Sequence, residues 1–544
     1  MTDDATKDDA IKDNAIKDDT TKDDAIKDDT TKDDATKDDT MTHVLVLGDQ
    51  LTREGVLTEC EPERTSVLMI ESLALAHELH HHKQKLVMTF AAMRHFAQAL
   101  EQDSFTVVYT RADSFAAGIE QYLEQHPGIT LHVMQPNDWG YDELIANAVE
   151  KAGGTCKLHP NPLWLSDDER FRTWADGKKE LRMEYFYRDM RKSLDFLMDG
   201  DAPAGGKWNY DAANRKTPEA EHTFPDPLVF EHTDITREVI EDVTATFPEH
   251  FGATDGFNYP VTREQALQAL DHFCETRLRD FGPYEDAMVQ GESQLYHSLL
   301  SAPLNTGLLS PREVCETALA YAADGRRKIP LNSIEGFIRQ VIGWREFMFR
   351  VYRYKMPQFK QANALAHERP LPELFWTGDT KMNCLHQVID QLKKTAHNHH
   401  IQRLMVLGNF ALLVGVKPQE LLEWFTACYI DALEWVMVPN VIGMSQYADS
   451  TFTSKPYVSS ANYINKMSNY CGSCHYSHSK KTGDNACPFN SLYWDFLARH
   501  EDAFGDNPRM NLVMANWRKR KPESQQALRE RAQEVLAQLE AGTL

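Results

Sequence analysis

Short apolar runs alternate with helical patterns through the first third of the chain. Five runs rich in valine, leucine and isoleucine have strand length: 44–48, 66–70, 106–109, 131–136 and 156–160. Between them, stretches such as 72–102 and 113–125 carry apolar residues at helical spacing. Strands separated by helices usually form a parallel sheet. We therefore expect a Rossmann-like α/β domain over residues 42–165.

The pattern changes in the second half of the chain. Residues 166–235 are mixed, with a basic helix followed by a loop containing glycine and proline, and we interpret them as an interdomain linker. From about residue 236 the β-rich runs stop, and helical periodicity dominates to about residue 535. We expect an all-helical domain over 236–510 and a basic helix over 511–544. The predicted fold class is α/β plus all-α.

The first 40 residues differ in composition from the rest. They are a repeat of the type KDDAT or KDDTT, with 15 Asp and 7 Lys and no aromatic residue. Such a segment cannot bury enough apolar surface to fold, so residues 1–40 are predicted to be disordered. They carry −8 of the net charge of −24, which leaves −16 for the remainder. That charge argues against non-specific coating of nucleic acid but leaves room for a local basic groove.

Two segments have the composition of such a groove. Residues 170–192 hold eight Arg or Lys against four acids, and Trp517 to Lys521 form a compact basic run. Each is equally compatible with a solvated helix face. The chain has nine cysteines and shows neither a signal peptide nor an apolar run long enough to span a bilayer. We expect a cytoplasmic protein whose paired thiols serve metal or redox chemistry.

Four cysteines form the most specific motif. Cys471, Cys474 and Cys487 follow the spacing C-x2-C-x12-C-P, and Cys384 is the expected fourth member. Four thiolates suit either a structural zinc ion or an iron–sulfur cluster. The spacing alone does not distinguish the two.

Several strings in the helical half are unusual in combination: FGPYEDAM (281–288), HSLLSAPLNTGLLSP (297–311), EGFIRQVIGWREF (335–347), and the longer segments 380–413 and 424–449. In this order they resemble the FAD-binding domain of the photolyase/cryptochrome superfamily. With the four cysteines, the chain resembles the iron–sulfur bacterial branch, the prokaryotic (6-4) photolyases, over residues 42–510. The resemblance implies a [4Fe–4S] cluster on the four cysteines and a monomeric enzyme.

The resemblance also implies where FAD binds. The segment 297–301 would cradle the phosphates, and Arg403 with Asp431 would meet the isoalloxazine edge. Where many photolyases carry Asn near the flavin N5, this chain has Met437. The full expected set is Tyr284, His297, Ser298, Leu299, Leu300, Ser301, Arg345, Arg403 and Asp431.

Catalysis would use the paired histidines His399 and His400, with His400 as the proton donor and Tyr457 as a helper. Reversal of a (6-4) lesion requires a general acid because a proton and an oxygen-bearing group must be returned. The eukaryotic enzymes have another histidine four residues later, where this chain has Leu404. Trp376 and Trp424 correspond to redox-active tryptophans of the branch.

Two further sites follow from the resemblance. Lys207, Asp211 and Arg215 lie in the loop that would reach the flipped lesion, and Asp211 with Asp286 could bridge a divalent cation such as Mg²⁺. The N-terminal domain would hold a 6,7-dimethyl-8-ribityllumazine antenna. Its expected contacts, at the end of the first strand and of the second, are Gly48, Asp49, Gln50 and Glu71.

The implied function is light-driven repair of pyrimidine–pyrimidone (6-4) photoproducts in UV-damaged DNA, a carbon–carbon lyase reaction without net redox change. Three alternatives remain open at this point. The chain could be a cryptochrome-like photoreceptor with the same cofactors, or it could repair cyclobutane dimers. In a different class, it could be a helical iron–sulfur subunit that binds nucleic acid, as the large subunit of primases does.

Overall fold

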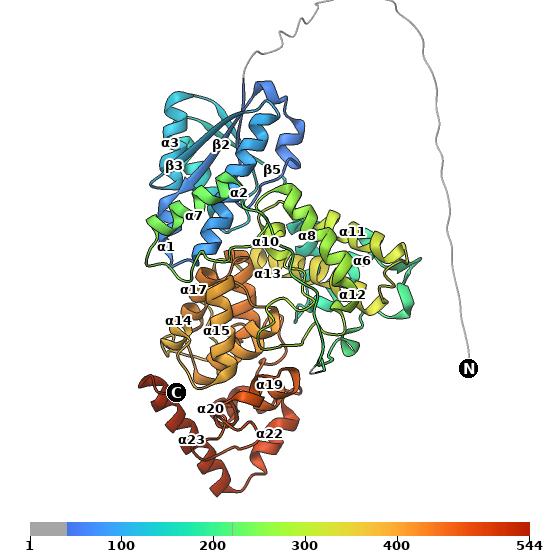
Figure 1. The fold of residues 1–544 in the computed structure, drawn as a ribbon, viewed down its shortest axis with the longest axis vertical. Coiled ribbons are helices and arrows are strands. Elements are labelled where there is room, and N and C mark those ends of the chain that lie inside the picture. Colours follow the sequence, from blue (N-terminus) through green and yellow to red (C-terminus); the bar gives the residue numbers. More distant parts are fainter. Residues whose placement is uncertain (1–40, 220) are drawn as a thin grey trace, which may run out of the picture. The chain divides into compact units, whose positions relative to one another are not determined.

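A five-stranded parallel sheet forms the N-terminal part of the computed structural model, which describes residues 41–219 and 221–544 (Figure 1). All five predicted strands are present, and their order in the sheet is β3-β2-β1-β4-β5. The disorder predicted for residues 1–40 lies outside the described residues. The strands are β1 (Thr42–Leu45), β2 (Thr65–Ser72), β3 (Thr106–Ala112), β4 (Thr130–Met134) and β5 (Thr155–His159).

Alternation along the strands places helices on both faces of the sheet. Val44 and Val67 pack in one core cluster with α2 (Lys83–Gln102), whereas Leu45 and Leu68 pack in another with α3 (Phe115–Gln125) and α4 (Tyr141–Lys151). The single helix suggested by residues 72–102 is divided into α1 (Leu73–Glu78) and α2. The division occurs at His82, whose ring nitrogen accepts a hydrogen bond from the Gln84 amide and caps α2.

The segment interpreted as a linker contains regular structure. It includes α5 (Asp168–Ala175) and α6 (Met183–Leu194). It also includes a short antiparallel hairpin whose strands have two residues each, β6 (Met198–Asp199) and β7 (Ala202–Pro203). At its end, α7 (Asp234–Thr246) packs against α2 of the sheet layer (Figure 1). Residues 41–544 form one compact unit, and the domain boundaries drawn from the sequence remain a prediction.

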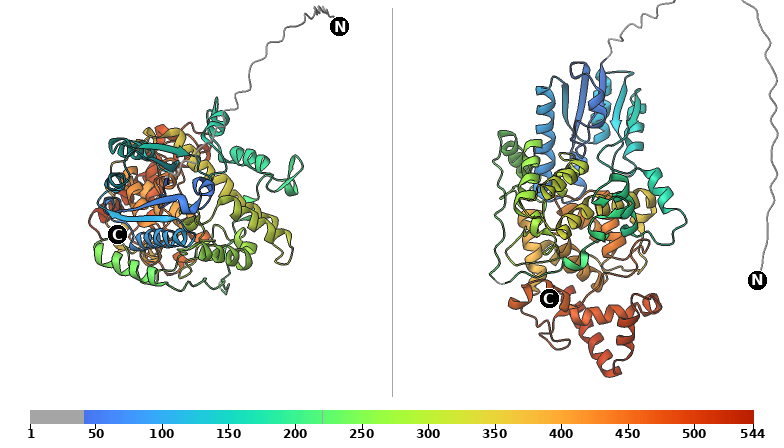
Figure 2. Two further views of the ribbon diagram at one scale, coloured as in Figure 1. Left: turned by 90° about the horizontal axis from the view of Figure 1, so that it is seen from above. Right: turned by 90° about the vertical axis from the view of Figure 1, so that its right-hand side faces the viewer.

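The remainder is helical, and in the described part of the chain no strand follows β7 (Figure 2). The helices that surround the site are α8 (Arg263–Thr276), α9 (Leu278–Phe281), α10 (Ser301–Asn305), α11 (Pro311–Ala323), α12 (Leu331–Ile338), α13 (Glu346–Lys355), α14 (Leu374–Thr377), α15 (Asn383–Thr395), α16 (Asn409–Val414), α17 (Pro418–Cys428), α18 (Glu434–Val438), α19 (Ala461–Met467), α20 (Pro488–Arg499) and α21 (Glu501–Phe504). Three π-helical segments interrupt them, Arg339–Arg345, Gln402–Gly408 and Pro439–Ser445. Such segments are rare and frequently occur at functional sites.

The C-terminal region corrects one expectation. Residues 511–544 form two helices, α22 (Asn511–Arg518) and α23 (Pro522–Glu540), where the sequence suggested one basic helix. Pro522 has no backbone N–H to continue a helix and is favoured at a helix start, so the chain breaks there. α23 packs on α20. Among the described helices, none has the length and apolar character needed to cross a membrane.

Candidate functional site

Three histidine rings meet where α15 ends. α15 stops at Ala396, whose φ of 52° is left-handed, and the following turn leads to His399 and His400. The ring of His399 stacks on that of His297 at a centroid distance of 4.6 Å and an angle of 13°. The ring of His400 lies 6.0 Å from His399, and 49% of its side chain is exposed. The structure thus brings together the two predicted catalytic histidines and one residue predicted to cradle FAD.

The two stacked histidines are neutral acceptors or donors for a bound molecule. Burial holds the pKa of His297 and of His399 well below the usual 6.5. The Nε2 atom of each is buried and has no hydrogen-bond partner within the described residues, and buried polar atoms normally have one. One nitrogen from each of the three rings lies within 4.8 Å of the others. The stacked rings are nearly parallel, so their in-plane lone pairs do not converge on one metal ion.

Charged side chains lie beside the exposed ring of His400. Its Nε2 lies 3.5 Å from an Asp286 carboxylate oxygen, and Arg215 Nε lies 3.9 Å from the other oxygen of Asp286. Arg215 also pairs with Asp211. The two acids expected to bridge a divalent cation therefore contact the same guanidinium group. A cation between them would have to displace Arg215.

The remaining residues of the lesion loop lie nearby or on the surface. Tyr457 is half-buried, and its pKa is raised by burial and is also affected by the charges of Arg509, Asp211 and Arg215. The charges of the Arg215 group therefore act on the predicted helper. Lys207 is exposed, with its Nζ 5.8 Å from the centre of the Tyr210 ring.

A buried ion pair lies behind the histidines. Arg403 donates to both carboxylate oxygens of Asp431, at 2.9 and 3.2 Å, and the Ser301 hydroxyl donates to Asp431 at 2.7 Å. Although burial raises the pKa of Asp431, the Arg403 charge and hydrogen bonds outweigh it, so the net shift is downward. Three residues expected near FAD are thus held in one network.

The other residues of the expected FAD set have varied surroundings. Leu299 has a left-handed φ of 56°, and the amide of Leu300 donates to the Ser298 hydroxyl. Tyr284 stacks on Tyr296, with ring centroids 5.4 Å apart. Arg345 donates to the Leu163 carbonyl, and its guanidinium lies 4.0 Å from the Trp164 ring. Arg345 therefore packs at the junction between the segment after β5 and the helical part.

The two predicted redox tryptophans are neighbours. Trp376 and Trp424 have ring centroids 6.4 Å apart, and Trp424 is 1% exposed. The sequence reasoning missed Tyr429, whose ring lies 6.1 Å from Trp424 and 4.0 Å from the Arg403 guanidinium. The signal available in the sequence was its position, five residues after Trp424 and two before Asp431. Aromatic rings thus lead from the Arg403–Asp431 pair to half-buried Trp376.

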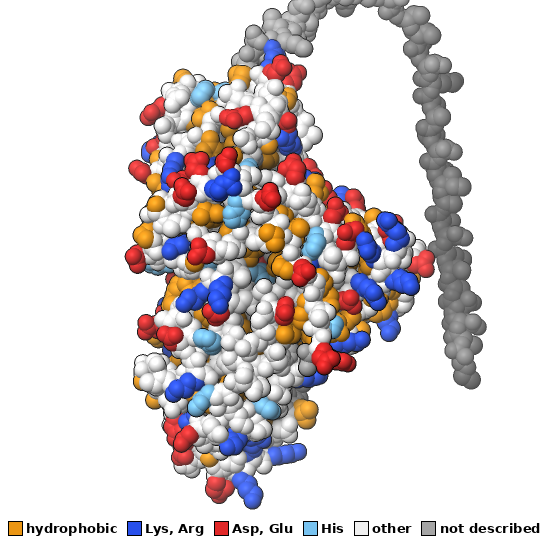
Figure 3. Space-filling model, in the orientation of Figure 1, with side chains coloured by type: hydrophobic (Ala, Val, Ile, Leu, Met, Phe, Trp, Pro, Cys, Tyr) orange, Lys and Arg blue, Asp and Glu red, His pale blue; other side chains and the backbone are white. Residues whose placement is uncertain are grey.

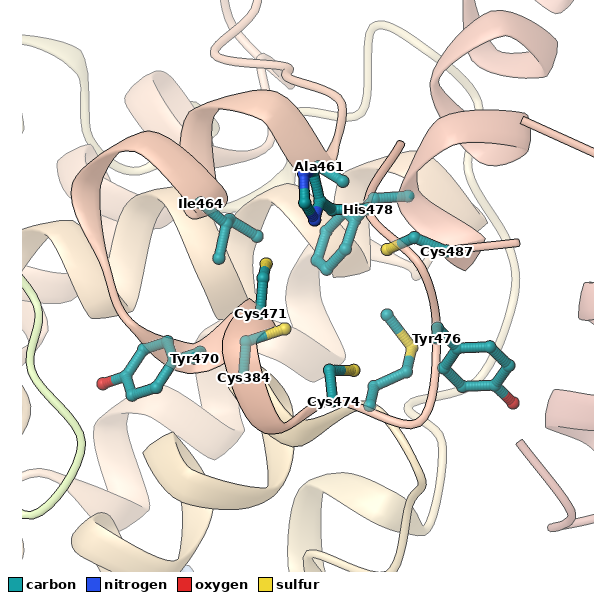
Figure 4. A pocket seen from close by; sticks show the side chains of 11 residues that line it. Cys384, Ala461, Ile464, Tyr470, Cys471, Cys474, Tyr476, His478 and Cys487 are labelled. Atoms are coloured by element: carbon teal, nitrogen blue, oxygen red, sulfur yellow. The ribbon is translucent and has the colours of Figure 1, made fainter. Parts of the chain in front are cut away.

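The four cysteines line one pocket (Figure 4). Cys384 lies in the first turn of α15, Cys471 lies in a 3-10 turn with Cys474 directly after it, and Cys487 precedes the first residue of α20. The remaining wall is mostly apolar and aromatic: Met382, Ala461, Ile464, Tyr470, Tyr476, His478 and Phe489. The chain thus converges from three separate segments on this pocket.

The full or partial burial of the four thiols and their mutual proximity suit a bound metal group. Burial raises the pKa of Cys384 well above its usual value, and burial and the neighbouring thiols raise that of Cys487 to about 12 and of Cys471 to about 11. A metal would supply the positive charge that keeps these thiolates ionised. Four thiols around one pocket could hold either a zinc ion or a polynuclear cluster.

The predicted antenna residues form two groups near the carboxyl ends of the strands. Asp49 accepts from Asn137 at 2.7 Å, and Gln50 donates to the Gln135 carbonyl at 2.9 Å. A cleft of about 540 Å³ is lined by Gln135, Asn137, Trp164, Arg350 and neighbouring residues, but not by Asp49 or Gln50 themselves.

The other two antenna residues adjoin α2. A Cβ on Gly48 would approach the Met93 sulfur to 3.0 Å, so glycine allows the helix to lie close to the end of β1. Glu71 pairs with Arg94 of α2 and accepts from the Tyr109 hydroxyl. Its carboxylate is already held by protein groups.

Basic side chains gather on the part of the helical region that includes α6 and α11 (Figure 3). On α6, the charged groups of Arg188, Arg191 and Lys192 lie 5.4–5.6 Å from the ring of Trp208 in the following loop. Arg191 is buried, so Arg188 and Lys192 are the cations of this group that suit contact with a nucleic-acid strand.

Comparison with known proteins agrees with this arrangement. A family model described as deoxyribodipyrimidine photo-lyase-related protein matches residues 44–259. Over 506 residues the chain is 42% identical to a (6-4) photolyase of Agrobacterium fabrum, covering 91% of this chain and 99% of that protein.

Solved structures show the same fold at low sequence identity. A bacterial class III photolyase from Agrobacterium tumefaciens superposes with a TM-score of 0.55 at 15% identity, covering 92% of this chain and 98% of that one. A cryptochrome from Synechocystis gives a TM-score of 0.54 at 14% identity, covering 89% of this chain and 99% of that one. The parallel sheet, the helical region and the extended sequence identity together show that this chain belongs to the photolyase family.

Proposed function

We propose that the protein repairs (6-4) photoproducts in UV-damaged DNA under light. The observation that carries this proposal is the exposed His400 beside Asp286 and Arg215, next to a second, buried histidine. The (6-4) photolyase relative of 42% identity supports the same lesion class. Photoreception without repair would have no need for a proton donor at the surface of the site.

His400 is proposed as the general acid. Its ring is exposed, so a flipped lesion can reach it, and Asp286 lies 3.5 Å from its Nε2 and orients it. Arg215 and Lys207 would contact the lesion or its phosphates, because both are cationic and both lie in the loop after α6. Tyr457 would support this end of the site.

FAD is the proposed cofactor, and the structure offers it polar groups. Asp431, Arg403 and Ser301 form a fixed ionic network, and His297 and His399 present unpartnered buried nitrogens. Once bound and reduced, FAD supplies the electron on illumination. The chain holds the cofactor, and Trp424 and Trp376 would connect it to a reductant at the surface.

We further propose a [4Fe–4S] cluster on Cys384, Cys471, Cys474 and Cys487, supported by their convergence on one pocket from three separate segments of the chain. The lumazine antenna is proposed near the carboxyl ends of the strands. There the 540 Å³ cleft is lined by Asn137 and Gln135, the hydrogen-bond partners of Asp49 and Gln50. Mg²⁺ between Asp211 and Asp286 and a monomeric state remain proposals.

A repair assay on defined lesions tests the function. The purified protein, with its flavin and iron content measured, is illuminated with oligonucleotides that carry either a (6-4) photoproduct or a cyclobutane dimer. We expect light-dependent repair of the (6-4) lesion only. His400→Ala should lower that repair by about 100-fold or more, the usual contribution of a general acid, while light-driven flavin reduction continues.

His80→Ala, which removes another exposed histidine on the α/β side, is the control and should repair normally. Normal flavin photochemistry with no (6-4) repair in the unaltered protein would favour a photoreceptor. Full repair by His400→Ala would refute the proton-donor role.

A further inference from the structure

Two glutamine side chains form a closed amide pair beneath the histidine turn. Gln402 is fully buried, and its Nε2 donates to the Gln391 Oε1 at 2.9 Å. Gln391 Nε2 donates back to Gln402 Oε1 at 3.3 Å. Gln391 lies on α15, and Gln402 begins the π-helical segment after the histidines. The pair therefore joins the two elements that flank the turn.

The same pair holds the backbone of the histidine turn. The amide of His399 donates to Gln402 Oε1 at 3.0 Å, and the carbonyl of His397 accepts from Gln391 Nε2 at 3.0 Å. These two bonds lie on either side of Asn398. They set the direction in which the chain enters His399 and His400, and hence which ring is buried and which is exposed.

The pair also contacts the cysteine pocket. Gln402 Nε2 donates to the Tyr470 hydroxyl at 3.0 Å. Tyr470 lines the pocket, and it directly precedes Cys471 (Figure 4). Its carbonyl accepts from the side chain of Asn383, the residue before Cys384. One buried amide thus connects the cysteine loop with the backbone of the histidine turn.

We propose that Gln402 is a positioning residue that transmits the placement of the cysteine loop to His399 and His400. The inference rests on the proposed repair function of these histidines. When the loop is ordered around its metal group, Tyr470 holds the Gln402 amide in one orientation, with the oxygen directed at the His399 amide. Without that contact the amide can turn, the His399 N–H loses its acceptor, and the turn loosens.

Three variants separate this role from general packing. Tyr470→Phe removes only the hydroxyl that joins the loop to Gln402. Gln402→Leu removes every bond of the amide, whereas Gln402→Glu keeps an acceptor for the His399 amide and one for the Tyr470 hydroxyl but loses the donor to the Gln391 Oε1. Tyr493→Phe is the matched control, since it removes the hydroxyl of a half-buried tyrosine on α20 that does not line the pocket.

Two readouts are taken on holoprotein matched for flavin and iron content. Hydrogen–deuterium exchange of the peptide containing His399 reports whether its amide remains bonded. Steady-state repair of the (6-4) lesion gives kcat and KM separately. We expect Tyr470→Phe and Gln402→Leu to speed exchange at this peptide and to lower kcat by roughly tenfold to a hundredfold with little change in KM, as a misplaced catalytic group does.

Gln402→Glu should exchange more slowly at this peptide than Gln402→Leu, because an acceptor for the His399 amide remains, and Tyr493→Phe should behave as the unaltered protein. In the double variant, Tyr470→Phe should add nothing to Gln402→Leu, because the contact is already gone. Unchanged exchange and kcat in Tyr470→Phe, or losses that add in the double variant, would overturn the inference. Failure of the unaltered protein to repair the lesion would instead refute the proposed function, and the exchange measurement would still test the coupling.

Discussion

Three histidines near the site, His297, His397 and His399, are kept neutral by their surroundings. Burial is the largest cause in each, and it lowers the pKa of His397 to about 3. The cationic Arg403 acts in the same direction on His397. A neutral ring can accept a hydrogen bond from a bound molecule at one nitrogen and donate at the other. The ring of His400 is the member of the group that is exposed to solvent.

The lowered pKa of His397 predicts a pH dependence of stability. Below pH 6.5 the unfolded chain binds a proton at this residue that the folded protein does not bind until about pH 3. Stability from this source is therefore present above pH 6.5 and is lost as the pH falls. His397→Gln should make the free energy of unfolding fall less steeply with decreasing pH, by about 1.4 kcal/mol per pH unit.

Urea unfolding of His397→Gln and of the unaltered protein at several pH values between 6.5 and about 4 measures this slope. Equal slopes in His397→Gln and the unaltered protein would show that His397 takes up its proton in the folded state.

For individual residues, the sequence predicted which side chains take part in the site better than it predicted the contacts between them. The adjacent His399 and His400 were predicted as a pair, and the structure places them as neighbours with one buried and one exposed. The stacking of His297 on His399 joins segments about 100 residues apart, and no local pattern encodes it. Gln402 carried no signal at all, because a buried amide acts through partners that only the fold supplies.

Among the elements, α17 and the segment after it connect the ionic network to the surface. Trp424 lies on α17, Tyr429 follows its last residue, and Trp376 lies on the short helix α14. The Tyr429 hydroxyl donates to the Asn398 side chain in the histidine turn. The aromatic path and the histidine turn therefore share one anchoring residue.

Trp424→Phe should interrupt this path. Phenylalanine keeps the packing shape of a ring but is much harder to oxidise, and Phe425 beside it cannot substitute. We expect a strong loss of light-driven flavin reduction in the presence of an external reductant, with flavin content unchanged. Trp494→Phe, in the separate stacked pair with Trp517, is the control. Normal photoreduction in Trp424→Phe would mean that electrons enter elsewhere.

The element boundaries show what periodicity can and cannot predict. β2 was readable because a buried parallel strand is a continuous apolar run, whereas the outer strands β3 and β5 are partly exposed and were predicted from shorter runs between helical patterns. The break between α1 and α2 was missed because it depends on His82, whose ring caps α2 and also lies within hydrogen-bond distance of the Lys393 carbonyl on α15. Pro522 was a signal in the sequence for the start of α23, but the prediction of one helix over 511–544 did not use it.

At the scale of the whole molecule, the cysteine pocket joins parts of the chain that are distant in sequence. Cys384 belongs to α15, which leads to the histidines, whereas Cys471, Cys474 and Cys487 belong to the loop between α19 and α20. α20 in turn supports α23 near the C-terminal end. A metal group that cross-links these segments would stabilise the C-terminal region against local unfolding.

Cys471→Ser should therefore affect the C-terminal region more than the sheet. We expect the purified variant to lose its iron and, in hydrogen–deuterium exchange, to lose protection over α19, the cysteine loop and α20, because the free energy that the metal contributes to folding is gone. One face of the sheet packs with α3 and α4 in a core cluster that contains no residue of the cysteine pocket, so the strands should keep their protection. Cys60→Ser is the matched control, since Cys60 lies outside the pocket and its thiol donates to the Val56 carbonyl, as a serine hydroxyl can also do. If Cys471→Ser retained its iron and its protection, the cysteines would not be holding the C-terminal region together through a cluster. If protection were lost over the sheet as well, the region would not unfold on its own, and the pocket would instead support the molecule as a single cooperative unit.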